Sequence, residues 1–303
     1  MTATIGSIKA ASNMPPEDAW MIRPVDAQDA DRILSIIHGA KWKHQHLDWL
    51  DVLDLLDQKP FMIALSGGKP MGALACPPDP PGVCWLRFFA AAHDVKPGAL
   101  WDKLWPGASA AAAADGIETA CVLLLSRWLT PFLVRSGFAE TNAVVFLEWR
   151  TGPFPVLAPI QGTLRPMLTS DLHAVAEIDR RAFDGIWRIS NASISAAMRQ
   201  GAYATVIEAE GRMAAYQIST ASALGAHLAR LAVDPASQGQ GLATALVGDV
   251  LREFVRRGQD RLTVNTQEDN GRSRRLYRRL GFRETGDIFP VYQIDLTGPS
   301  PKH

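Results

Sequence analysis

The chain has little cysteine and no net charge, and each shortage argues against a class of protein. Its three cysteines, Cys76, Cys84 and Cys121, are far apart, so the sequence indicates neither a disulfide framework nor a zinc site. We expect buried free thiols and no bound metal. Because the formal net charge at pH 7 is +0, the overall electrostatics give no reason to expect nucleic acid or a membrane surface as a partner.

Long apolar runs are also missing. No run is long enough to span a bilayer, and residues 1–19 lack the basic start and apolar centre of a secretory signal. We therefore expect a cytoplasmic protein whose first residues, up to about Trp20, form a mobile tail. With 303 residues, of which 47% are hydrophobic and 20% charged, the chain has the composition of a soluble globular protein of about two domains. The sequence leaves open whether it is a monomer or a homodimer.

What the chain does contain is a loop with two glycines, residues 238–241, between an apolar strand and an amphipathic helix. From Leu242 the apolar residues recur at helical spacing, as at Leu246, Val250 and Phe254. The first amides of a helix have no partner within the helix and carry a partial positive charge, so a loop without bulky side chains lets a phosphate come close. The loop lacks the lysine of a Walker motif and the third glycine of a dinucleotide fingerprint. An ordinary strand-to-helix turn would use glycine as well.

The pattern that fits the loop is Gln/Arg-x-x-Gly-x-Gly/Ala, supplied by Gln238, Gly241 and Ala243. It resembles the acetyl-CoA loop of the GNAT superfamily of N-acetyltransferases. A second segment resembles the other half of that site, because Asn270 is followed by a serine three residues later, a tyrosine seven residues later and Gly-Phe at 281–282. The two segments lie in the family's order and spacing, and together they make the resemblance specific.

The resemblance implies an α/β fold with a mixed sheet, and a role for each matching residue. Tyr277 would be the general acid that gives a proton to the departing CoA thiolate, since a phenol keeps its proton at neutral pH. Asn270 would touch the pantetheine arm of acetyl-CoA, and Ser273 would lie near it. The backbones of Leu231 and Val233 would bind the pantetheine and the thioester. The residues expected at the pyrophosphate are Gln238, Gly239, Gln240, Gly241, Leu242, Ala243 and Thr244.

The general base is not evident from the sequence. An attacking amine must lose a proton, often through water to an acidic side chain. In one branch of the superfamily, the ribosomal-protein alanine acetyltransferases, a glutamate lies five residues before the asparagine. Here that position is Asn265, which does not titrate in the useful range. The remaining candidates are His227, Glu208, Glu268 and Asp287.

The sequence also repeats itself at a nearly constant spacing. Matching positions, separated by 142 to 144 residues, are Arg23 and Arg165, Asp29 and Asp171, and Gly137 and Gly281. Such spacing over the whole length indicates two tandem copies of one fold. We expect a degenerate unit over residues 20–150 and a catalytic unit over residues 160–297, joined by a connector that contains prolines.

The hydrophobic pattern of the first copy predicts strands at 21–25, 85–89, 122–125 and 144–149, a hairpin of 61–65 and 71–75, and helices through 33–37, 109–114 and 132–135. Its loop, residues 95–101, lacks the acetyl-CoA pattern and contains a proline and a tryptophan that would obstruct a phosphate. Leu133 and Ser126 stand where Tyr277 and Asn270 stand in the second copy. We predict that the first copy does not bind acetyl-CoA.

These observations predict a tandem GNAT protein whose second copy transfers an acetyl group from acetyl-CoA to a primary amine by direct attack in a ternary complex. A small molecule, a peptide N-terminus and a lysine side chain remain open as acceptors. Phe183 and Trp187, which precede the second hairpin, are expected in the acceptor pocket. The alternative is a non-catalytic acyl-CoA sensor or scaffold, in which Tyr277 only packs at the edge of the core; the missing base favours it, and the retained tyrosine and asparagine favour the enzyme.

Overall fold

The structure is a computed structural model that describes residues 19–46, 49–152, 154–155 and 158–298. The tail expected before Trp20 lies almost wholly outside these residues. Trp20 itself is buried, with 8% of its surface exposed, and belongs to the core of the first copy. None of the described helices is both long and apolar enough to cross a membrane.

Both halves of the chain alternate strands and helices. The elements of the first half are β1 (Met21–Pro24), α1 (Ala30–Gly39), β2 (Trp42–Gln45), β3 (Phe61–Ser66), β4 (Lys69–Ala75), β5 (Val83–Trp85), β6 (Phe88–Ala91), α2 (Pro97–Ala114), β7 (Thr119–Leu123), α3 (Thr130–Arg135) and β8 (Ala139–Arg150). Those of the second half are β9 (Thr163–Pro166), α4 (Leu172–Ala182), α5 (Asn191–Gln200), β10 (Tyr203–Ala209), β11 (Arg212–Ser222), β12 (Gly225–Val233), α6 (Leu242–Arg256), β13 (Arg261–Gln267), α7 (Gly271–Arg279) and β14 (Arg283–Asp295).

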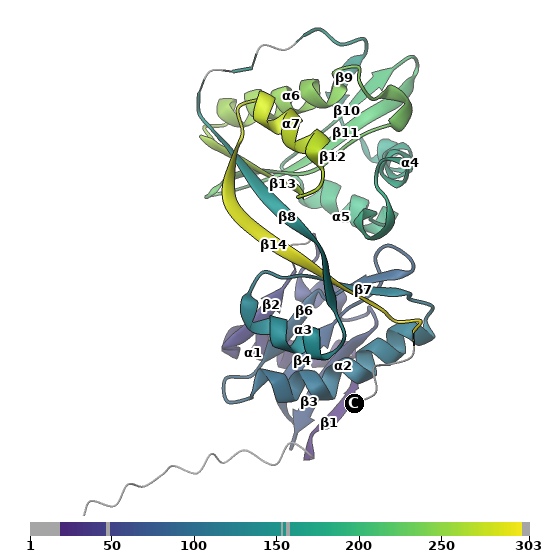
Figure 1. Ribbon diagram of the computed structural model, residues 1–303, viewed down its shortest axis with the longest axis vertical. Coiled ribbons are helices and arrows are strands. Elements are labelled where there is room, and N and C mark those ends of the chain that lie inside the picture. Colours follow the sequence, from purple (N-terminus) through teal and green to yellow (C-terminus); the bar gives the residue numbers. More distant parts are fainter. Residues whose placement is uncertain (1–18, 47–48, 153, 156–157, 299–303) are drawn as a thin grey trace, which may run out of the picture.

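The described strands form two sheets (Figure 1). One has the order β1-β3-β4-β6-β2, and the other, β5-β7-β14-β8-β13-β12-β11-β10-β9, runs through both halves. Alternate residues of β10 and β11 point to opposite faces of this second sheet. Val206 and Tyr216 pack with α4 and α5, whereas Ile207 and Ala215 pack with α6. Helices therefore cover both faces of the sheet in the second half.

Strands β8 and β14 each cross into the other half. Residues 144–150 of β8 pair with residues 261–267 of β13, and residues 291–295 of β14 pair with residues 119–123 of β7. The two long strands also pair with each other, and Figure 1 shows them side by side between the two halves. The sheet of each copy is therefore completed by a strand from the other copy.

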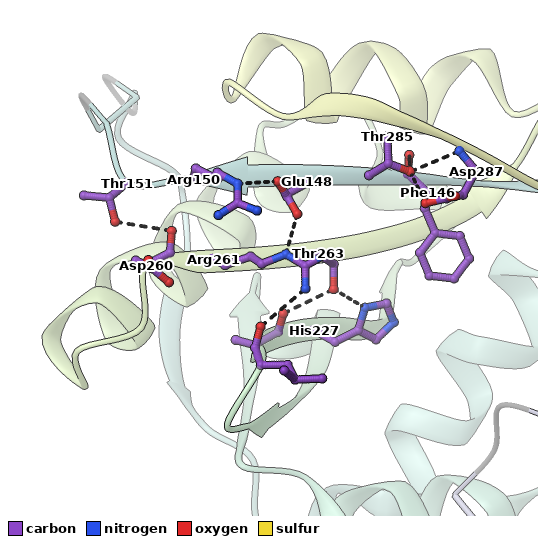
Figure 2. A network of polar contacts seen from close by, with 12 residues as sticks. Phe146, Glu148, Arg150, Thr151, His227, Asp260, Arg261, Thr263, Thr285 and Asp287 are labelled. Carbon is purple, nitrogen blue, oxygen red and sulfur yellow. Dashed lines mark hydrogen bonds and ion pairs between the residues drawn. The ribbon is translucent and has the colours of Figure 1, made fainter.

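A charged contact reinforces this exchange of strands (Figure 2). The carboxylate of Glu148 on β8 accepts a hydrogen bond from Arg261 on β13 and another, 2.6 Å long, from Arg150. These two guanidinium groups lower the pKa of Glu148, so the carboxylate is charged at neutral pH.

The internal repeat appears in the structure as the same polar contact made twice. Arg23 binds Asp29 at 2.6 Å near the start of α1, and Arg165 binds Asp171 at 2.7 Å near the start of α4. Each aspartate also accepts a backbone amide three residues before it. The repeat inferred from these positions is thus visible in the local geometry.

Two predicted elements of the first half were wrong in extent. The strand expected over 85–89 is interrupted at residues 86–87, because β5 pairs in parallel with β7 whereas β6 pairs with β4 and β2 in the other sheet. The helix expected over 109–114 begins at Pro97 and continues through Pro106, so most of the predicted loop 95–101 is helical. The cysteine prediction is confirmed: all three are buried free thiols.

Candidate active site

The second half contains a parallel strand pair that separates. β12 and β13 pair only where residues 226–228 face residues 262–264. Beyond this point β12 stays with β11, after a bulge at Ala229, and β13 stays with β8. The separation leaves backbone groups of residues 229–233 on an open strand edge. An extended ligand can hydrogen-bond to such an edge as an added strand would.

The two-glycine loop follows the open end of β12. Gly239 has φ of 83° and Gly241 has φ of 81°, a conformation that glycine adopts without strain. A Cβ on Gly239 would meet no atom within 4 Å, and one on Gly241 would meet only Ile160, at 3.8 Å. Gly241 is the N-cap of α6 and no side chain caps the helix. No side chain therefore caps the first amides of this helix, and the space beside the two glycines is open, which suits an anion site.

Gln238 connects the loop to the second motif. Its side-chain nitrogen Nε2 donates to the backbone carbonyl of Val233 at 3.4 Å, and its side-chain oxygen Oε1 accepts a hydrogen bond from Arg272 on α7. The start of α6 and the start of α7 are thus joined by a side chain of the loop.

The second motif begins at the N-cap of α7, Asn270, and its Ser273 and Tyr277 lie within the helix. Asn270 caps the helix, because its side-chain oxygen accepts from the amide of Ser273 at 3.0 Å; its amide nitrogen donates to Gln267 at 3.3 Å. Tyr277 is 5% exposed, and its ring centroid lies 5.5 Å from that of Phe282. Burial raises the pKa of Tyr277, so the phenol keeps its proton at neutral pH.

A cavity of about 960 Å³ brings several of these residues together. Leu231, Asn270, Ser273 and Tyr277 all line it. Val233 and residues 238–244 do not line it; they follow along the chain, past the open edge of β12. Phe183 and Trp187, which we expect in the acceptor pocket, also line the cavity; their contact with an acceptor stays a prediction.

The first half supplies part of the cavity wall, which sequence reasoning did not foresee for any particular residue. Side chains of His46, Trp85, Arg87 and Leu123 line the cavity. Trp85 and Leu123 belong to a buried cluster that also contains residues of β8 and β14. The only signal in the sequence was the repeat itself, which could not show which faces of the two copies meet.

Of the four candidate bases, His227 on β12 lines the cavity (Figure 2). Its Nδ1 lies 2.9 Å from the hydroxyl oxygen of Thr263, and that hydroxyl donates to the carbonyl of Ala226 at 3.3 Å. The ring also lies 6.3 Å from that of Phe146, centroid to centroid. Burial lowers the pKa of His227 to about 4, so the imidazole is neutral near pH 7.

The other three candidates lie elsewhere. Glu208 is bound to Arg165, Asp287 is exposed and bound to Thr285, and Glu268 is exposed. None of these carboxylates lines the cavity, nor does any cluster of three or more potential metal ligands occur in the described part of the chain.

In the first half, aromatic rings pack together between β6, the turn after β7, and α3. Trp128, on the turn after β7, has its ring centroid 5.9 Å from that of Phe89 on β6 and 6.1 Å from that of Phe132 on α3. A Cβ on Gly98, at the start of α2, would lie 3.0 Å from the ring of Phe132. Trp101, which we expected to obstruct the loop, is fully buried and donates to Ser136 instead.

Comparison with known proteins agrees with this geometry. The family model of the acetyltransferase (GNAT) domain matches residues 176–298. The [ribosomal protein bS18]-alanine N-acetyltransferase of Escherichia coli K12 is 31% identical over 122 residues, which cover 40% of this chain and 81% of that protein. The chain belongs to the GNAT acetyltransferase family.

Solved structures show the same fold over almost the whole chain. A tandem GNAT protein from the clavulanic acid biosynthesis pathway superposes with a TM-score of 0.67 at 17% identity. The match covers 93% of this chain and 100% of that chain. A GCN5-related N-acetyltransferase from Sphaerobacter thermophilus gives a TM-score of 0.62 at 15% identity, covering 94% and 97% of the two chains. The predicted fold class, a mixed α/β structure with two tandem GNAT folds, is confirmed.

Proposed function

We propose that the second unit, residues 160–297, transfers an acetyl group from acetyl-CoA to a primary amine by direct attack in a ternary complex. The observation that carries this proposal is the opening between β12 and β13. It has a glycine loop at one end and, at the other, a cavity that contains Tyr277. Extended binding along a strand edge, an anion at a helix start and a proton donor are the three requirements of this transfer.

The residues present suit acetyl-CoA. The open edge at Leu231 and Val233 would bind the pantetheine arm and the thioester, and the amides of residues 239–244 would hold the pyrophosphate. Bound acetyl-CoA supplies an acyl group on a good leaving group. Strand-edge amides aimed at the thioester oxygen would stabilise the negative charge that develops there. Asn270 holds the start of α7 in place, and its remaining amide hydrogen can reach toward the ligand.

Tyr277 suits the role of general acid. Its pKa is raised by burial, so it is fully protonated over the working range, yet it can donate to a thiolate as the negative charge forms. It packs in one cluster with Val264 and Leu231, residues of the two strands that separate, and all three line the cavity.

His227 suits the task of receiving and orienting the amine. With the Thr263 hydroxyl proton on the Ala226 carbonyl, Nδ1–H donates to Thr263 and Nε2 is left as the hydrogen-bond acceptor. A histidine with a pKa of about 4 does not strip a proton from a free ammonium ion, so the amine would be taken up in its neutral form. In the ribosomal-protein alanine acetyltransferases a glutamate is expected five residues before the asparagine. This chain has Asn265 at that position, so the proposed role of His227 differs from that arrangement.

The first unit, residues 20–150, would hold no acetyl-CoA. We infer that the rings of Trp128 and Phe132, which lie 6.1 Å apart, would occupy its counterpart of the pantetheine path. Its α2 begins with Pro97, which has no amide hydrogen to offer. Its contribution would be the cavity wall that carries Trp85 and His46.

Calorimetric titration tests the asymmetry between the units. Acetyl-CoA should bind at one site per chain, and Gly241→Trp should remove that site by filling the space in front of α6. Two sites in the wild-type protein, or none, would contradict the proposal. A screen of primary amines for release of free CoA then tests the transfer itself.

A second experiment tests His227. His227→Gln should lower kcat by about 100-fold, the usual contribution of a positioned acid or base, and leave the acetyl-CoA dissociation constant within about twofold. Thr263→Val should lower kcat less, because the ring keeps its place but loses the partner that selects its tautomer. His93→Gln, at an exposed histidine of the first half, is the control. An unchanged kcat in the His227 variant would remove this residue from the mechanism.

A further inference from the structure

Aromatic side chains from both halves line the cavity. The ring of Trp85 lies 5.2 Å from that of His46 and 5.8 Å from that of Trp187, centroid to centroid. Phe146 on β8 and Phe183 after α4 line it as well. Apart from Trp85, which is buried, these rings are half-buried, so part of each surface remains to be covered. Flat apolar ligands cover such surfaces well, because offset and edge-on contacts between rings are favourable.

The cavity offers no open carboxylate to a positively charged ligand. Asp79 is the only acidic side chain on the wall among the described residues. One of its oxygens accepts from the amide of Ser190 at 2.7 Å, and the other accepts from the hydroxyl of Ser193 and from Arg87 at 3.1 Å. Asp79 thus holds α5 of the second half to the first half, and both of its carboxylate oxygens already accept hydrogen bonds from the protein.

Three arginines lie on the wall, and each is paired with a carboxylate: Arg87 with Asp79, Arg188 with Asp184 and Arg230 with Asp179. Arg230 is bound to the buried Asp179 by two hydrogen bonds of 2.7 and 2.9 Å, and its guanidinium group lies 3.6 Å from the ring centroid of Phe183. One face of the Phe183 ring is therefore already covered by a cation.

We propose that the acceptor is a primary amine on a flat aromatic body that carries no second positive charge. This inference rests on the proposed transfer reaction and names its substrate class. The reacting amine enters neutral, and its aromatic body packs against Trp187 and Phe146. A second ammonium group would find no unpaired carboxylate on the described wall and would lie near three guanidinium groups. Polyamines, and lysine side chains in basic segments, are disfavoured for that reason.

Three amines of similar length separate the two parts of the proposal: hexylamine, 1,6-diaminohexane and 2-phenylethylamine. Release of CoA measures kcat/KM for each. Calorimetric binding of each amine to the protein saturated with CoA gives a second readout that needs no turnover. We expect 2-phenylethylamine to exceed hexylamine by about tenfold, since a ring contact adds that much, and the diamine to fall about tenfold below hexylamine.

Matched variants locate the preference. Trp187→Leu should reduce the advantage of 2-phenylethylamine over hexylamine to about twofold or less without changing the acetyl-CoA dissociation constant, and Phe146→Leu is a second variant with the same expectation. Trp42→Leu is the control, because Trp42 is also a half-buried tryptophan in a ring contact, with Trp128, but does not line the cavity.

The outcomes separate this inference from the proposed function. A diamine that reacts or binds better than hexylamine, or an aromatic advantage that survives in both cavity variants, overturns the acceptor class while the transferase stands. Acetyl-CoA that does not bind, or binds without CoA release by any amine, overturns the proposed function. In the second of those cases the binding order of the three amines still decides the acceptor class.

Discussion

The two glycines at the ends of α6 allow the role of the loop to be separated from its effect on stability. Gly241 precedes the helix with φ of 81°, and Gly258 follows it with φ of 79°. A Cβ would meet only Ile160, at 3.8 Å, in the first case and no atom within 4 Å in the second. Alanine at either position therefore fits sterically, and the change costs only the strain of a left-handed backbone.

That strain sets the expected loss of stability. A left-handed conformation costs a residue with a Cβ about 1 to 2 kcal/mol. For a chain of this size each kcal/mol lowers the melting temperature by roughly 2 to 4 °C. Gly241→Ala and Gly258→Ala should therefore lower it by similar amounts, as measured by thermal unfolding in the absence of ligand.

Ligand binding should distinguish the two variants. The methyl group of Gly241→Ala enters the space in front of α6 where the pyrophosphate of acetyl-CoA is proposed to lie. We expect its dissociation constant to rise about tenfold, which is about 1.4 kcal/mol, whereas Gly258→Ala should bind as the wild type does. Calorimetry at a temperature where both variants are folded measures this. Equal dissociation constants in the two variants would refute the placement of the pyrophosphate.

Three further changes have defined outcomes. Tyr277→Phe should lower kcat by at least about tenfold with acetyl-CoA affinity intact; unchanged turnover would exclude the proton-donor role. Arg230→Met leaves the carboxylate of Asp179, which is 0% exposed, without its charged partner, and should cost about 3 to 5 kcal/mol of unfolding free energy in urea. The Tyr216 hydroxyl also donates to Asp179, and a loss below about 1 kcal/mol would show that this hydrogen bond alone satisfies the carboxylate. Hydrogen bonds from Arg23 lower the pKa of Asp29 to about 2, so the stability from this pair is present above pH 4 and is lost as the pH falls towards 2. Asp29→Asn should remove that part of the acid dependence, about 2 kcal/mol, and a pH profile identical to the wild type would contradict it.

The features that the sequence predicted correctly depend on short-range patterns. The glycine loop before an amphipathic helix and the matched Arg and Asp positions of the two copies lie within a few residues, where spacing determines geometry. The sequence did not show that Asn270 caps the next helix or that each matched arginine binds its aspartate. The tandem fold followed because the same short patterns occur twice. Site roles for these residues remain proposals.

What the sequence could not predict depends on distant pairing. Leu86 and Arg87 lie between Trp85 and Phe88, and nothing in this local pattern marks the end of a strand. Only the different partners of β5 and β6 show why the strand breaks there. The start of α2 at Pro97 was hidden because Pro106 and Gly107 argue against a helix in that segment. The contribution of Trp85 to the cavity depends on how β14 lies against β7, about which no local pattern carries information.

The exchange of β8 and β14 also bears on how the two copies can diverge. Without residues 139–150, β13 would lose its partner along the edge that faces away from β12, and β14 would lose a partner along most of its length. The loss of a ligand site that we propose for the first copy would leave this pairing intact, because β8 still completes the sheet of the second copy. A duplicated domain in this arrangement can give up its chemistry and still be indispensable to the fold of the copy that keeps it.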